Sequence, residues 1–92
     1  MFFVYVLENP TGILYKGSTN NLRKRILDEH NSNKYKSYTR NKGPWKLFYF
    51  EAFFTREEAE AREKFFKSKA GWYFLKLIAI DKSNGKLLNE AG

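Results

Sequence analysis

Residues 2–17, FFVYVLENPTGILYKG, decide the fold of the amino-terminal part of the chain. The run Phe2–Leu7 is rich in aromatic and β-branched residues, which favour a strand. Pro10 and Gly12 follow it and are typical of a turn, and Ile13–Lys16 supplies a second, shorter run. The stretch therefore predicts two antiparallel strands joined as a hairpin.

The segment after the hairpin predicts a short amphipathic helix. Asn20 or Asn21 can cap its amino end, and the helix is expected to run to about His30. Its apolar positions form a narrow stripe, suited to one buried face, made of Leu22, Ile26 and Leu27. The polar stretch 31–44 that follows is rich in Lys and Asn and is expected to be a loop.

The second half of the chain predicts one strand and two helices. Trp45–Phe53 carries apolar residues on both faces, which predicts a central strand. Thr55–Glu58 has the pattern of a capping box, so a helix should begin there and run to about Lys69, with Gly71 as its stop. Trp72–Ile80 predicts a third, shorter helix.

The element order β-β-α-β-α-α indicates an α+β fold, with a small three-stranded antiparallel sheet flanked by helices. We expect one domain over residues 1–80 and a polar carboxy-terminal tail over residues 81–92. The 92 residues include nine Phe, six Tyr and two Trp, enough large side chains to close a core in a short chain. The sequence has no Cys, which excludes disulfide partners and thiolate metal sites.

The charge balance favours a polyanionic partner. Lys and Arg number 17 against 10 Asp and Glu, a formal net charge of +7, and nucleic acid is the first candidate. No segment has the roughly 20 apolar residues of a membrane span. The amino terminus resembles a strand and not a signal peptide, so a cytoplasmic location is expected.

Four residues form a candidate chemical set. Tyr5 and Tyr15 lie in the neighbouring strands of the hairpin, and Arg25 lies on the basic turn that follows. Glu63 falls on the apolar face of the second helix, where a carboxylate is costly unless it is paired or binds a cation. Such a set suits phosphoryl chemistry: Glu63 for a metal, Arg25 for the anionic transition state, and a Tyr oxygen for the attacking water.

The same residues carry a resemblance to a known family. Phe3–Tyr5 and Tyr15–Gly17 resemble the two halves of the GIY-YIG signature, with their tyrosines ten residues apart. The stretches Gly17–Arg25, Tyr38–Leu47 and Glu58–Lys64 are also similar to the small stand-alone members of that family. The resemblance covers roughly residues 2–77, and the ordered set is more specific than either tripeptide.

The resemblance implies a nuclease domain like those of the bacterial ABC excinuclease and of phage homing endonucleases. It assigns Tyr15 to the attacking water, Tyr5 to an assisting role and Arg25 to the phosphate under attack. Glu63 would be the sole protein ligand of one divalent cation, Mg²⁺ or Mn²⁺. The implied substrate is DNA, in repair or recombination, and the residues expected to contact it are Gly17, Arg23, Lys24, Lys36, Arg40 and Lys42.

Several positions differ from the family pattern. Phe3 and Val4 stand where the first motif has Gly and Ile, and Lys16 stands where the second motif has Ile. Family members often place a His four residues after the arginine, whereas His30 is five after Arg25 and Glu29 takes the i+4 position. On a regular α-helix, i+5 lies about 140° from Arg25, so His30, a further catalytic candidate, returns to the site only if the helix ends or bulges. The Asn that other members place after the glutamate has no counterpart in residues 75–78.

Other interpretations remain open. Tyr5 and Tyr15 could be a cross-strand aromatic pair, and Glu63 could join an ion network with Arg62, Lys64 or Lys67. The chain could be a catalytically inactive DNA-binding module of the same fold. It could also be a protein-interaction domain whose aromatic residues in 65–74 form a homodimer face. The expected oligomeric state is a monomer or a weak dimer.

Overall fold

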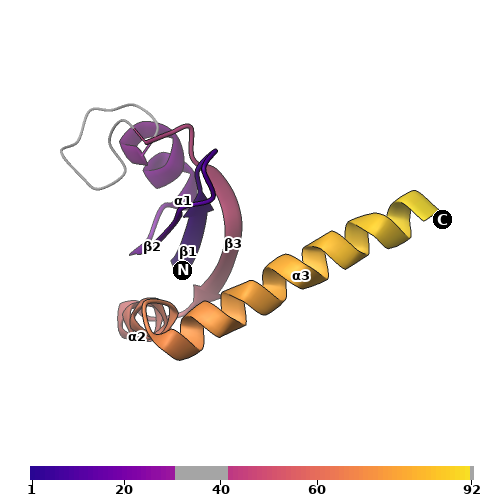
Figure 1. Cartoon of the computed structure of the whole chain (residues 1–92). Coiled ribbons are helices and arrows are strands. Elements are labelled where there is room, and N and C mark those ends of the chain that lie inside the picture. The colour runs from indigo at the N-terminus through magenta and orange to yellow at the C-terminus, as the bar shows by residue number, and fades with distance from the viewer. Residues whose placement is uncertain (31–41, 92) are drawn as a thin grey trace.

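The fold is a three-stranded antiparallel sheet with helices packed against it (Figure 1). The computed structural model describes residues 1–30 and 42–91, without the side chains of 28–30 and 84–91. The predicted α+β class is confirmed. The elements in chain order are β1 (Phe2–Glu8), β2 (Leu14–Thr19), α1 (Leu22–Lys24), the π-helix η1 (Arg25–His30), β3 (Lys46–Phe53), α2 (Arg56–Phe66) and α3 (Lys69–Ala91).

Strand β1 is the centre of the sheet, whose order is β2-β1-β3. Its four residues Val4–Leu7 are fully buried, which explains why the run is apolar without alternation. The expected hairpin of β1 and β2 is confirmed, with Tyr5 opposite Gly17. The central position predicted for Trp45–Phe53 is wrong, because β3 is an edge strand with Leu47 and Phe50 exposed at 40% and 47%.

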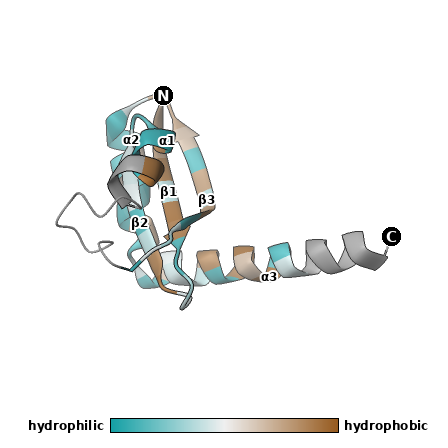
Figure 2. Cartoon of the chain, turned by 90° about the horizontal axis from the view of Figure 1, so that it is seen from above, coloured by the Kyte–Doolittle hydropathy of each residue, from teal (hydrophilic) through white to brown (hydrophobic). Residues whose placement is uncertain are grey.

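Alternation along β1 divides the core into two clusters, and β1 is the hydrophobic band within the sheet in Figure 2. On one face, Tyr5, Leu7 and Trp45 pack with Tyr15, Leu22 and Ile26. On the other face, Val4 and Val6 pack with Phe66 of α2 and Leu75 of α3. The sheet is therefore covered by α1 and η1 on one side and by α2 and α3 on the other.

The first helix changes its geometry after one turn. Asn21 caps it, since the side-chain oxygen accepts a hydrogen bond from the Lys24 N–H at 3.2 Å. The α-helical part ends at Lys24 and continues as the π-helix η1. Leu22 and Ile26 face the core as expected, but Leu27 is 53% exposed, so the predicted third position of the stripe is wrong.

The predicted start of α2 is confirmed and its predicted end is wrong. Thr55 and Glu58 form both hydrogen bonds of the capping box, each at 3.2 Å. The helix ends at Phe66, and Gly71 lies inside α3. A Cβ at Gly71 would collide with the Phe65 carbonyl and would lie 2.5 Å from the Phe66 Cα. Gly71 thus permits the close approach of α3 to the end of α2 and does not act as a stop.

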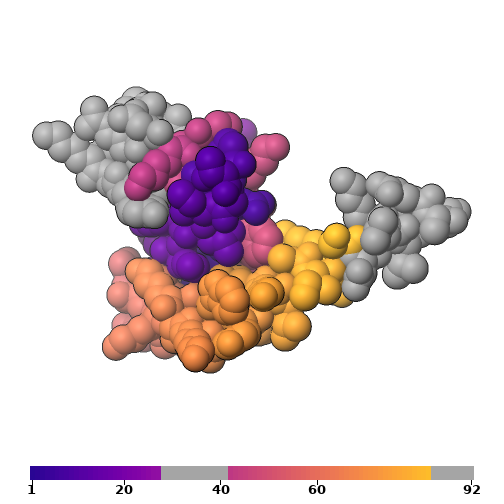
Figure 3. Space-filling view, viewed as in Figure 1, coloured from indigo at the N-terminus to yellow at the C-terminus, as the bar shows by residue number. Residues whose placement is uncertain are grey.

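Helix α3 is longer than expected. It begins three residues before the predicted Trp72 and continues to Ala91, so residues 81–91 are helical in backbone. Figure 3 shows the hairpin resting against α2 and the first part of α3. The domain boundary at residue 80 stays a prediction. Within the described ranges, no helix combines the length and the apolar character needed to cross a membrane.

Candidate active site

Tyr5 and Gly17 form the base of the candidate site. They face each other across β1 and β2, and the tyrosine ring lies directly over the glycine. A Cβ on Gly17 would be 2.5 Å from the Tyr5 Oη and 2.6 Å from its Cζ. Only glycine leaves room for the phenol of Tyr5 at this position, which explains sterically why the second motif ends in Gly17.

The Tyr5 hydroxyl is held in its neutral form. Burial raises the pKa of Tyr5 well above its usual value, and the neighbouring Tyr15 raises it further. The charge of Arg25 and a hydrogen bond from its side chain oppose this rise, and the charge of Glu63 adds to it. Tyr5 is therefore suited to donate a hydrogen bond and not to accept a proton from water near neutral pH.

Tyr15 lies beside Tyr5 on the same face and is only half-buried. The two ring centroids are 6.4 Å apart, and the Tyr15 ring also meets Trp45 edge to face at 6.3 Å. These contacts fix the ring orientation while part of the side chain stays accessible. Of the two tyrosines, Tyr15 is the one whose position suits contact with an attacking water.

Arg25 links the helix η1 to the sheet through its contact with Tyr5 of β1. It is the first residue of η1, is half-buried, and its side chain hydrogen-bonds the Tyr5 side chain. The π geometry changes the expectation for His30, whose side chain lies outside the described part of the chain. Because hydrogen bonds of a π-helix join residues five apart, i and i+5 lie on similar faces. The backbone therefore returns His30 to the side of Arg25, unlike a regular α-helix.

Glu63 is paired with a cation. Its carboxylate Oε2 accepts a hydrogen bond from the Lys67 Nζ at 2.7 Å, and its side chain is 21% exposed. Of the three partners considered, the structure selects Lys67. Arg62 instead binds Glu51 of β3 through two hydrogen bonds, of 2.7 Å and 3.2 Å. The cost of placing a carboxylate on the inner face of α2 is thus offset by an ion pair.

Glu63 fits a metal ion that takes one protein ligand. In the described residues no three acidic, His or Cys side chains gather into a metal-binding group. A hard cation such as Mg²⁺ is often held by one carboxylate, with waters and phosphate oxygens as its other ligands. Glu63 already holds an ammonium group and remains partly accessible, so it suits this kind of coordination.

The expected DNA-contacting residues have different positions. Arg23 and Lys24 are exposed on α1, and Lys42 is half-buried, with its carbonyl accepting a hydrogen bond from the Asn9 amide at 3.2 Å. Gly17 is buried beneath Tyr5. Lys36 and Arg40 lie outside the described residues. The DNA contacts of all six remain predictions.

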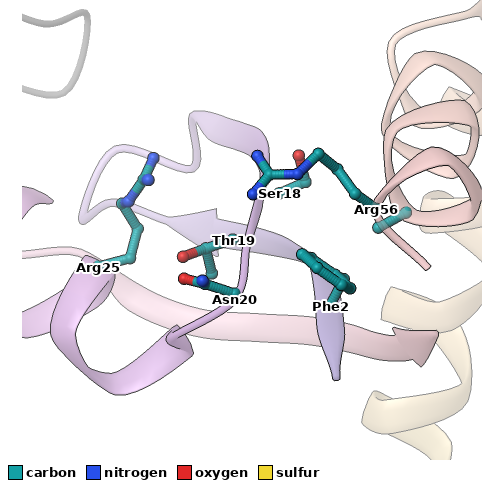
Figure 4. A pocket seen from close by; sticks show the side chains of 7 residues that line it. Phe2, Ser18, Thr19, Asn20, Arg25 and Arg56 are labelled. Atoms are coloured by element: carbon teal, nitrogen blue, oxygen red, sulfur yellow. The ribbon is translucent and has the colours of Figure 1, made fainter. Parts of the chain in front are cut away.

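Two features were not found from the sequence. One is a cluster in which the Glu51 carboxylate accepts hydrogen bonds from Tyr49 at 2.7 Å and from Arg62. The other is a pocket of about 80 Å³ between Arg25 and Arg56 (Figure 4). The only sequence signal for the pocket is the position of Arg56 as the first residue of α2 after its cap.

Comparison with known proteins places the chain in a family. The family model of the GIY-YIG catalytic domain matches residues 1–72. A UPF0213 protein from Clostridium perfringens is 44% identical over 79 residues, which cover 86% of this chain and 84% of the relative. A UPF0213 protein from Streptococcus agalactiae is 45% identical over 67 residues, covering 73% of this chain and 75% of the relative.

A solved structure agrees with these matches. The solution NMR structure of a UPF0213 protein from Bacillus halodurans is 34% identical, with a TM-score of 0.50. The similarity covers 87% of this chain and 85% of that one. The names of these relatives state a family and no activity. With the hairpin tyrosines, Gly17 and Arg25 arranged as described, the chain belongs to the GIY-YIG catalytic-domain family.

Proposed function

We propose that the protein is a metal-dependent endonuclease that hydrolyses phosphodiester bonds in DNA. The observation that carries this proposal is the convergence of Tyr5, Tyr15 and Arg25 on one face of the hairpin, with the charge of Glu63 acting on Tyr5. The net charge of +7 supports a polyanionic substrate. A role in repair or recombination, a cytoplasmic location and a monomeric or weakly dimeric state belong to the same proposal.

Each residue has a role that its surroundings support. The Arg25 guanidinium binds the phosphate under attack and stabilises the charge that develops on it. Tyr15 orients the attacking water through its hydroxyl, and Tyr5, which stays neutral, donates a hydrogen bond within the same site. Glu63 would hold Mg²⁺ or Mn²⁺, which when bound supplies charge neutralisation at the phosphate.

His30 completes the proposed site as a positioning or proton-transferring group. The π-helix absorbs the extra residue between Arg25 and His30, so both fall on one side of the helix backbone. Single π-turns within helices occur often at functional sites. Deleting one of residues 27–29 would place His30 four residues after Arg25, on the same side of a regular α-helix. We therefore expect this variant to retain cleavage.

The direct test is cleavage of supercoiled plasmid and of labelled branched DNA, with Mg²⁺ or with EDTA. We expect products only with Mg²⁺, and Glu63→Ala should lower the rate by at least about 100-fold because the metal ligand is lost. Glu60→Ala is the matched control, since Glu60 is an exposed carboxylate on the same helix. Cleavage by Glu63→Ala at the wild-type rate would contradict the proposal.

A catalytically inactive DNA-binding module is the second candidate. The observation in its favour is the ion pair of Glu63 with Lys67, which occupies one carboxylate oxygen. This function predicts salt-dependent retention of DNA with no product band on any substrate when Mg²⁺ is added.

A further inference from the structure

A small pocket next to the Tyr5–Arg25 pair has the lining of an anion site. It lies at the end of β2, between η1 and the first turn of α2. Figure 4 shows Arg25 and Arg56 on opposite sides of Thr19 and Asn20, with the Arg56 guanidinium extending toward Ser18. None of its lining residues is acidic; they are Phe2, Ser18, Thr19, Asn20, Arg25, Arg56 and Ala59.

Arg56 is held in place by its surroundings. Its guanidinium lies over the Phe2 ring, 5.2 Å from the centroid, a contact that orients a long and exposed side chain. The nearby acid Glu58 is engaged elsewhere, because its Oε1 accepts hydrogen bonds from the Thr55 hydroxyl at 2.9 Å and the Thr55 N–H at 3.2 Å. The capping box therefore engages the carboxylate of Glu58, one of the two acids in the first turn of α2.

Of the polar side chains between the two arginines, one is already hydrogen-bonded within the turn and two can turn toward a ligand. The Thr19 hydroxyl is engaged within the turn, since it accepts from the Asn21 N–H at 3.1 Å. Ser18 is half-buried and Asn20 is exposed, so both can turn a donor toward a bound group. Two guanidinium groups with hydroxyl and amide donors match the oxygens of a phosphate, which arginine recognises with a planar fork.

We propose that this pocket binds a second phosphate of the DNA backbone, next to the phosphate held by Arg25. Arg25 lines the pocket and also contacts Tyr5, so the second position is adjacent to the proposed reaction centre. Arg56 is then a positioning residue that fixes the register of the strand. This inference takes from the proposed function only the identity of the ligand, which is DNA.

The first experiment measures binding without cleavage. A fluorescein-labelled duplex is titrated with wild-type protein in EDTA between about 50 and about 200 mM salt. Arg56→Gln should weaken binding by about 10-fold and reduce the slope of log K against log salt by about 0.9, as for one lost phosphate contact. Arg56→Lys should keep the slope. Lys64→Gln, which removes one exposed charge elsewhere on α2, should change binding by less than about 2-fold.

The outcomes separate this inference from the proposed function. The inference is overturned if Arg56→Gln and wild type bind DNA with the same affinity and the same salt slope. It is also overturned if Lys64→Gln loses as much affinity as Arg56→Gln, or if the wild type does not bind DNA. In the cleavage assay, Arg56→Gln should raise KM about 10-fold with kcat within about 2-fold. A fall in kcat alone would also overturn it. If no DNA is cut but the binding results hold, the nuclease proposal fails and the phosphate pocket stands.

Discussion

At the scale of single residues, the contact between Gly17 and Tyr5 decides whether the site can form. The Tyr5 Oη would lie 2.5 Å from a Cβ at position 17. Gly17→Ala should therefore cost about 1–3 kcal/mol of unfolding free energy, because the buried ring or β2 must move. It should also abolish cleavage. Urea unfolding and the plasmid assay measure the two effects.

Gly12→Ala provides the contrast. Gly12 has a positive φ of 87°, and a Cβ there would meet no atom within 4 Å. Its cost should be limited to about 1 kcal/mol of backbone strain, with cleavage intact. If Gly17→Ala were as stable and as active as the wild type, the Tyr5 phenol would not lie over position 17.

At the scale of elements, the Glu51–Arg62 pair ties strand β3 to helix α2. The Arg62 guanidinium also lies over the rings of Phe65, Phe66 and Phe74, at 4.5 to 5.0 Å from their centroids. Removing one partner leaves the other half-buried and unpaired. We expect Glu51→Gln to lower the free energy of unfolding by about 1–3 kcal/mol at pH 7, with the exposed Glu60→Gln near zero. If Glu51→Gln lowered the free energy of unfolding no more than Glu60→Gln does, the Glu51–Arg62 pair would not stabilise the packing of β3 on α2.

The same pair predicts a dependence on pH. Burial acts to raise the pKa of Glu51, but hydrogen bonds from Arg62 and Tyr49 outweigh it, and the pKa is lowered below 4.5. Because the folded pKa is lower than the unfolded one, the contribution is complete above pH 4.5 and is lost as pH falls through the folded value. Wild type and Glu51→Gln should therefore converge in stability at acidic pH. Urea midpoints from pH 7 to pH 2 measure this.

Lys67, at the end of α2, bears on metal binding by Glu63. Its Nζ occupies the Glu63 Oε2 at 2.7 Å, so a divalent cation must compete with it. Lys67→Met should tighten Mn²⁺ binding by about 5-fold, the equivalent of one exposed ion pair of about 1 kcal/mol. Calorimetric titration of Mn²⁺ is the measurement, with Lys64→Met as control. Unchanged affinity would place the metal away from this carboxylate.

At the scale of the whole molecule, the first part of α3 completes the core and the rest extends beyond the sheet (Figure 1). Leu75 is 2% exposed and packs with Val4, Val6 and Phe66, although the family match ends at residue 72. A chain ending at Gly71 should therefore fail to fold. A chain ending at Ser83 keeps Leu75 and the contact of Lys82 with the Phe48 carbonyl, and should unfold cooperatively and keep its activity. Circular dichroism melts distinguish the two.

The success of prediction varied with the kind of signal. The hairpin and the capping box at Thr55 depend on local chemistry, and both were predicted correctly. The position of β3 was not, because an edge strand that packs on helices and a central strand both carry apolar groups on two faces. Gly71 was misassigned for a similar reason: its function is to admit the Phe65 carbonyl of a neighbouring helix, which no local pattern reveals.

The sequence by itself determined the family, the α+β class, the order of elements and the spacing of Tyr5, Tyr15, Arg25 and Glu63, since these follow from local propensity and motif spacing. The tertiary structure decided which groups meet. It paired Glu63 with Lys67 and Arg62 with Glu51, replaced a regular helix by a π-turn before His30, and placed Arg56 across a pocket from Arg25. These outcomes depend on how close the packed elements come in space, which the sequence does not encode locally.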